Sequence, residues 1–502
     1  MSDSLTIKDA LTTDSQKKRG ILQKFFEGKF YPFLVAAIVL TGHITGYEAY
    51  LCCSLLILAS ISLLVCDSIK PFLPFLLTFV YQINKKHTPG HPTWSNYYLQ
   101  YEVLIPVLIC FLFFVVCIVK YFKNHVYPKL SIKKSPLMIS IILLSLAFIL
   151  NGAFSSKWNL ASLLYGSAQV LVYFFLFYLI FYGLEKENKD ELINHITYLT
   201  ALVALVLIGE MIFLFSTYEN LITQWGGHLN HGEVLLGWGV STPIGFSFSI
   251  LIPVLMRGTI KSKFSIVYFL IATFCLIFAF LTLSRNAMFF STLAFGISLV
   301  IILITSKKRF LLAFLAIILT ACFWYIFANY SEKLRDIFYF SFEYFGFSSN
   351  SRKRLWDRSI QMFRENLIFG SGFFGYDEEI SYTAATFLPD MAHGTIFQLL
   401  GSMGLLGIIS YAIYRIRSFA PFVRKITVDK ILLLGAILVT ICMSLLDNYM
   451  FYFSTIFYYT TILAVAFRIR EEDKKEIAAK KAEKQADKLK RKNLKTEKKI
   501  CE

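Results

Sequence analysis

The sequence contains few charged residues and no polar segment long enough for a sizeable soluble domain. Charged side chains make up 17% of its 502 residues, whereas 56% are hydrophobic. This balance excludes a soluble domain of appreciable size. Apolar runs close to the roughly 20 residues needed to cross a bilayer recur along the chain. We therefore predict an all-α fold, a polytopic transmembrane helix bundle of about 12–14 spans. The short run 71–83, which contains Pro71 and Pro74, is the least typical of them.

Cysteine pairs are absent from the loops expected outside the membrane. Eight of the nine cysteines fall in apolar segments and Cys501 lies in the tail, so we expect neither a disulfide framework nor a thiol site. Residues 1–29 hold no apolar core, so no cleavable signal peptide is expected. His228 and His231 have no carboxylate cluster beside them, which is a weak pattern for zinc. We predict a polar loop there, and no metal or cofactor.

Positive charge is concentrated in alternate loops. The net charge is +17, and basic residues crowd the short loops that the positive-inside rule assigns to the cytoplasm. The charge therefore indicates topology rather than nucleic-acid binding. It predicts a cytoplasmic N-terminal segment (1–29), a transmembrane domain (30–468), a large extracytoplasmic helical loop before the antepenultimate span (330–391) and a Lys-rich cytoplasmic tail (469–502).

Two basic clusters oppose this bias, because Lys85 with Lys86 and the run 352–358 fall in loops expected outside. The second cluster begins a predicted helix from Arg352 to Leu367, which contains neither glycine nor proline. Helical spacing puts apolar residues on one face and Lys353, Arg354 and Arg358 on the polar side.

Arg352 stands at the start of this helix. An arginine beside free backbone N–H groups can form a binding site for a phosphate or diphosphate. The alternative is an interfacial helix whose basic residues touch lipid headgroups, and composition alone favours that interpretation.

A glycine-rich stretch and one histidine follow the helix. The stretch from Gly370 to Gly375 predicts a chain reversal, and it lacks the lysine and serine of a P-loop. His393 opens a long apolar run in which Gly401, Gly404 and Gly407 predict close approach of another helix.

Isolated charged and aromatic residues mark the predicted spans. Arg285 lies in a tight turn at the membrane boundary, where either a functional role or snorkelling to headgroups explains it. Glu210 lies inside a span, where we expect it to pair with a buried arginine or to line a cavity. Trp238 is a candidate for sugar stacking.

Several motifs together resemble the O-antigen ligase and polysaccharide repeat-unit polymerase superfamily of bacterial membranes. They occur in the family's order, and they are Gly237–Pro243, Leu283–Arg285, Ser351–Trp356, Ile368–Gly372 and Ala392–Gly407. The resemblance implies an inverting, metal-independent glycosyltransferase of the bacterial cytoplasmic membrane. Its donor would be a glycan on undecaprenyl diphosphate.

The resemblance also assigns roles. Arg285 and Arg352 would hold the departing diphosphate, assisted by Lys353, Arg354 or Arg358. His393 would orient or deprotonate the acceptor hydroxyl, with Asp390 or Glu379 holding its tautomer. The family often has glycine where this chain has Asn286, and asparagine where it has Gly394.

The function predicted is polymerisation of lipid-linked repeat units into capsule, exopolysaccharide or O-antigen. The partners expected are membrane lipid and a polyprenyl-diphosphate-linked oligosaccharide, with a chain-length regulator and a flippase as possible protein partners. Ligase-type transfer of a finished glycan to a lipid or protein acceptor remains open, as do a lipid-linked sugar flippase and an assembly scaffold. A flippase predicts charges along a path through the bilayer, whereas these charges gather at one face.

Overall fold

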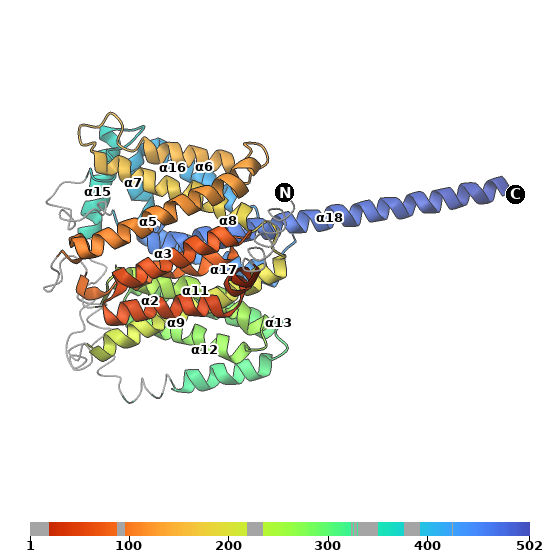
Figure 1. Ribbon diagram of the computed structural model, residues 1–502, viewed down its shortest axis with the longest axis horizontal. Helices are drawn as coiled ribbons and strands as arrows, with labels where there is room; N and C mark the ends of the chain where they lie inside the picture. Colours follow the sequence, from red (N-terminus) through yellow and green to blue (C-terminus); the bar gives the residue numbers. More distant parts are fainter. Residues whose placement is uncertain are drawn as a thin grey trace, which may run out of the picture.

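Helices make up nearly all of the regular structure in the computed structural model (Figure 1). The structure describes residues 20–87, 96–217, 234–322, 325, 329, 350–375, 392–423 and 425–501. The helices of the first half are α2 (Phe30–Thr45), α3 (Glu48–Val65), η1 (Lys70–Phe72), α4 (Leu73–Thr78), η2 (Phe79–Gln82), η3 (Lys85–His87), η4 (Tyr97–Leu99), α5 (Tyr101–Tyr121), η5 (Phe122–Val126), η6 (Tyr127–Lys129), α6 (Met138–Ile149), α7 (Leu160–Val170), η7 (Leu171–Leu176), α8 (Phe177–Gly183) and α9 (Lys189–Thr217).

The second half continues with a short antiparallel hairpin and the remaining helices. These are β1 (Leu235–Leu236), β2 (Gly239–Val240), α11 (Ser241–Lys261), α12 (Ser265–Leu281), α13 (Arg285–Thr305), α15 (Asn350–Glu365), α16 (Thr395–Ser418), α17 (Val428–Leu446), η9 (Tyr449–Phe451) and α18 (Phe453–Cys501). The prediction of an all-α polytopic bundle is confirmed.

Among the described residues, eight helices are long and apolar enough to cross a membrane. A ninth span results if the helix Gly20–Glu27 and α2, bent by 65°, are counted together. Shorter apolar helices occupy Met138–Ile149, Ser265–Leu281 and Arg309–Cys322. The predicted 71–83 segment is a buried, broken helix from η1 to η2 rather than one straight span, since Pro71 and Pro74 both stand at helix starts.

Helix α11 forms the centre of the bundle. In its most apolar stretch 94% of the residues are buried, against 11% for the span that contains α5, which therefore presents its surface to lipid. The central helix packs against α9, α12, α13 and α17. Two of these neighbours, α13 and α17, also carry residues of the candidate site.

The two ends of the bundle differ. Helix α15 lies at one end, outside the set of candidate spans, whereas α18 runs out of the bundle at the opposite end (Figure 1). The candidate site is built at the α15 end, where α13 and α16 begin and α17 finishes.

Candidate functional site

Arg285 is the first residue of α13. The side chain of Ser284 caps this helix by accepting a hydrogen bond from the backbone N–H of Ala287. Leu283, just before the cap, has a φ of 57°, which gives the tight turn out of α12. The next residue, Asn286, donates from Nδ2 to the carbonyl of Met443 at 3.3 Å and so ties the start of α13 to α17.

Helix α15 docks through the apolar face that its spacing predicts. Leu355, Ser359 and Met362 are buried, and Trp356 stacks on Phe397 of α16 with ring centroids 4.7 Å apart. The opposite face is exposed, and Arg352, Lys353 and Arg354 lie on it. The packing of α15 on α16 therefore brings the first turn of one helix next to the start of the other.

His393 lies two residues before α16 and has a φ of 48°, in the left-handed region that few non-glycine residues adopt. Its carbonyl accepts a hydrogen bond from Nε1 of Trp356 at 3.3 Å. The N–H of Gly394 donates to Oδ1 of Asn448 at 3.0 Å. Although the family's asparagine is missing after the histidine, the amide of Asn448 therefore lies against the same peptide.

The imidazole of His393 faces Asp447. Its Nδ1 is 3.4 Å from Oδ1 of this carboxylate, and the two side chains are 42% and 5% exposed. Nδ1 makes no hydrogen bond within the part of the chain that the structure describes. Asp447 is held in turn by the N–H of Asn448, which donates to Oδ1 at 2.7 Å. A buried carboxylate thus lies behind a half-exposed histidine.

Tyr449 lies close enough to Asp447 and Arg352 to feel the charges of both. The charge of Arg352 acts on both Arg285 and Tyr449. Burial raises the pKa of Tyr449 well above its usual value, and the nearby Asp447 raises it further. Its hydroxyl therefore stays protonated, and it donates to the carbonyl of Thr242 at 3.4 Å. Elements from four parts of the chain converge here.

The remaining basic candidates differ in placement. Lys353 and Arg354 are exposed beside Arg352, whereas Arg358 is 7% exposed and its Nη1 lies 3.3 Å from Glu365. Arg358 is therefore built into α15 itself. Lys353 and Arg354 stay available to a ligand at the surface.

Trp238 and Glu210 form one unit. Trp238 lies in the β1–β2 hairpin and donates from Nε1 to Oε2 of Glu210 at 2.7 Å, with its ring edge-on to Tyr81. The expectation that Glu210 pairs with a buried arginine is wrong, because its partner is this indole. Oε1 of Glu210 makes no hydrogen bond to the described residues. Because Trp238 is half-buried, only part of its ring is available for the sugar stacking that the sequence suggested.

The glycine-rich stretch is packed against a break in α16. Gly404 has φ 60° and ψ −152° inside that helix, and a Cβ there would lie 2.6 Å from the carbonyl oxygen of Leu367. The backbone of 367–372 bonds into the break through Leu405 and Leu406 and through the carbonyls of 401 and 402. Gly404 therefore admits a loop, not the second helix that its spacing suggested.

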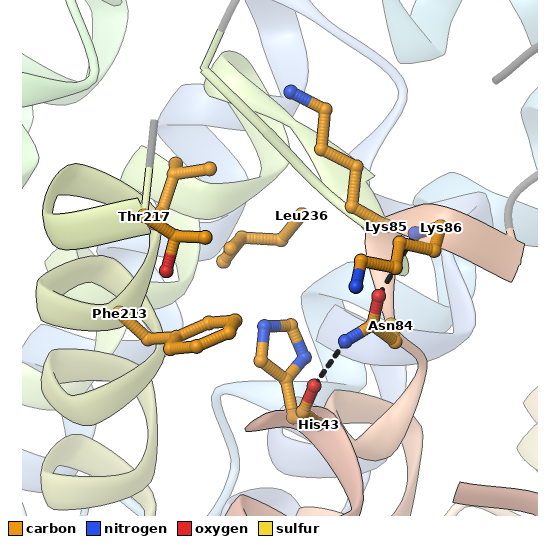
Figure 2. A pocket seen from close by; sticks show the side chains of 8 residues that line it. His43, Asn84, Lys85, Lys86, Phe213, Thr217 and Leu236 are labelled. Atoms are coloured by element: carbon orange, nitrogen blue, oxygen red, sulfur yellow. Dashed lines mark hydrogen bonds between the residues drawn. The ribbon is translucent and has the colours of Figure 1, made fainter. Parts of the chain in front are cut away.

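A small cavity lies at the same end of the bundle, between α2, α9 and β1 (Figure 2). Its volume is about 20 Å³, enough for one water molecule. Asn84 bridges its wall by donating to the carbonyl of His43 and accepting from the N–H of Lys86 at 2.8 Å. His43 places Nδ1 3.0 Å from the carbonyl of Ile83. This corner braces the loop that carries Lys85 and Lys86.

Some sequence predictions lie outside the described residues, namely those for His228, His231, Glu379 and Asp390. The carboxylate that faces His393 is instead Asp447, for which the sequence predicted no role. The one available signal was the Asp447-Asn448 pair itself, two polar residues between apolar runs.

Comparison with known proteins assigns the middle of the chain to a family. Residues 269–412 match the family described as O-antigen ligase. The match spans α12, α13, α15 and α16, and it ends before Asp447. No curated protein matches the chain. Residues 269–412, which carry Arg285, Arg352 and His393, are thus similar to the O-antigen ligase family, and the match supports the resemblance of this multi-pass membrane protein to the O-antigen ligase and polymerase superfamily.

Proposed function

We propose that the protein is a membrane glycosyltransferase that joins oligosaccharide repeat units carried on a polyprenyl diphosphate, at the outer face of the cytoplasmic membrane. The product would be a capsule, an exopolysaccharide or an O-antigen. The family match supports glycan transfer in general, and the site chemistry supports the donor class.

The observation that carries the proposal is the grouping of two arginines with a histidine–carboxylate pair at one end of the bundle. Arg285 and Arg352 are close enough to interact electrostatically, although like charges repel. A diphosphate can bind both guanidinium groups and offset their repulsion, because it offers several anionic oxygens. His393 faces Asp447 at the same end of the bundle, and the charges of Asp447 and Arg352 both act on Tyr449.

The proposed step is a single displacement. A hydroxyl of the acceptor sugar attacks the anomeric carbon of the donor, and the bond from that carbon to the diphosphate oxygen breaks. The polyprenyl diphosphate leaves with the electron pair, and its charge is stabilised by Arg285 and Arg352. The proton of the attacking hydroxyl passes to His393, whose other ring nitrogen faces Asp447. One displacement inverts the anomeric configuration, and this route uses no metal.

Ligase-type transfer is the second candidate, because the family that the chain matches is described as O-antigen ligase. A ligase shares the donor and the leaving group and differs in the acceptor. Purified protein given only lipid-linked repeat units separates the two: a polymerase lengthens the glycan, whereas a ligase needs an added acceptor.

The test is complementation of a deletion strain with Arg285→Ala, Arg352→Ala and His393→Ala at matched expression. We expect each variant to lose long polymer, with rates reduced at least about 100-fold for His393→Ala if it acts as the base. Polymer length on a gel and release of polyprenyl diphosphate by the purified protein are the two measurements.

The matched control is Arg364→Ala, an exposed arginine in the last turn of the same α15. It removes one positive charge from that helix at a distance from the candidate site, and we expect normal polymer. Full-length polymer from all three site variants would refute the site. Lipid-linked sugar crossing the membrane in their presence, with no transfer, would favour the flippase.

A further inference from the structure

A second charged cavity lies at the other end of the bundle, where α18 leaves it. It has a volume of about 230 Å³. One wall is formed by Lys425, in the connection between α16 and α17, and by Lys430, in the first turn of α17. The other wall is α18, and its lining residues are Arg470, Asp473, Lys474, Ile477, Ala478 and Lys481. We refer to this cavity as the tail pocket.

The α18 wall is one face of a helix. Its lining residues recur at intervals of one, three and four, which keeps them on a single stripe along about three turns of α18. The stripe is held against the bundle by ion pairs. Lys425 contacts Asp473 at 3.1 Å and Glu476 at 2.7 Å, and Lys430 contacts Asp473 at 2.8 Å.

The pocket carries more positive than negative charge, even though Lys474 is paired with Glu471 at 2.6 Å and Lys425 with Glu476 at 2.7 Å. Five cationic side chains and one carboxylate line it. Asp473 is already shared between Lys189, Lys425 and Lys430, with all three contacts at 3.5 Å or less. Arg470 and Lys481 have no acidic partner among the residues that the structure describes, and Nε of Arg470 is a buried donor without an acceptor there.

We propose that the tail pocket binds a phosphate-bearing anion through Arg470 and Lys481, with Lys425 and Lys474 at its rim. The ligand class follows from the chemistry: a phosphate supplies several acceptors to donors that lack them, and it offsets the excess charge. The position favours the headgroup of an anionic phospholipid, because the pocket lies where a helix leaves the membrane and clusters of basic residues at such sites attract anionic lipid. A soluble phosphate compound has the same recognisable chemistry.

The test uses the full chain, purified in detergent and stripped of lipid. Phosphatidylglycerol and phosphatidylcholine are titrated separately and bound lipid is counted by native mass spectrometry, while inorganic pyrophosphate serves as the soluble probe. We expect phosphatidylglycerol to bind more tightly than phosphatidylcholine. The double variant Arg470→Gln/Lys481→Gln should weaken its affinity about 10- to 30-fold, as expected for the loss of two basic contacts.

The control is Lys475→Gln/Lys480→Gln, which removes the same charge from the same helix at residues that do not line the pocket. It should leave the affinity within about twofold of the wild type. The double variant Arg470→Lys/Lys481→Arg conserves the charge and should retain binding. Retained binding would show that substitution at these two positions does not unfold the helix. Selective binding of pyrophosphate alone would support the pocket and identify a soluble ligand. Equal losses in both glutamine doubles, or binding of neither anion, would overturn the proposal.

Discussion

At the scale of single residues, Asp447 is the side chain that the structure adds to the site. Because its carboxylate faces Nδ1 of His393 from 3.4 Å, it can hold the proton on that nitrogen and leave the other ring nitrogen to face the acceptor. Catalytic hydrogen bonds are often long before substrate binds, so this distance suits a positioning role.

We therefore predict that Asp447→Asn lowers kcat by about 10- to 100-fold and leaves KM nearly unchanged, since a misplaced proton impairs the step and not substrate binding. The reaction to measure is transfer from lipid-linked oligosaccharide by purified protein. Asp447→Glu should recover part of the rate. A variant whose KM and thermal stability fall together with kcat would show that Asp447 only supports the fold.

Asp447 also shows which residues of the candidate site the sequence alone can predict and which it cannot. Arg285, Arg352 and His393 were predicted together because each sits in a motif or against the expected charge bias. Asp447 lies 54 residues after His393, as the numbering in the sequence shows, in a pair that resembles any turn between two spans. Only the packing of α17 against α16 and α13 gives it a role. The arginine partner expected for Glu210 was wrong for the related reason that its indole partner lies in a hairpin and not in another span.

At the scale of elements, helical faces were predictable and breaks were not. The apolar stripe of α15 follows from the 3.6-residue period, and it is the face that is buried. The break in α16 has no comparable signature in the sequence, because three glycines at that spacing are equally typical of close helix packing. The loop that fills the break is 30 or more residues away in sequence, which local patterns do not relate to it.

This break yields a prediction of stability. Gly404→Ala should destabilise the protein by about 2–4 kcal/mol, because alanine is strained at that backbone conformation and its Cβ would collide with the carbonyl of Leu367. Gly296→Ala is the control, since no atom lies within 4 Å of a Cβ there. It should be neutral or stabilising by about 0.5–1 kcal/mol. Thermal unfolding in detergent measures both, and similar melting temperatures for the two variants would show that the loop does not fill the break.

At the scale of the whole molecule, charge divides the bundle into two ends with different tasks. The α15 end gathers Arg285, Arg352, Lys353 and Arg354, and such a group of cations suits an anionic substrate. The opposite end pairs its cations extensively. Lys189 and Lys425 contact both Asp473 and Glu476, and Lys430 contacts Asp473, so that α18 is fastened to α9 and to the start of α17.

The stability that these ion pairs give to the attachment of α18 should decrease at low pH. Burial alone would raise the pKa of Asp473, but its hydrogen bonds to Lys430 and Lys425 lower it below its ordinary 3.8, and Lys189 lowers the pKa of Glu476 below 4.5. A lowered folded pKa means that the stabilisation is complete above the unfolded value and is lost as the pH falls through the folded one.

We accordingly predict that Asp473→Asn lowers stability by about 1–3 kcal/mol at neutral pH, because three lysines then share one fewer carboxylate. The difference in melting temperature between wild type and variant should stay constant from about pH 5 to 9 and shrink toward zero below about pH 4, where wild-type Asp473 also becomes protonated. Taking the difference at each pH cancels the acid sensitivity of the rest of the protein. A gap that persists unchanged at the lowest pH would mean that Asp473 acts through its shape and not its charge, and that the tail helix is not fastened electrostatically.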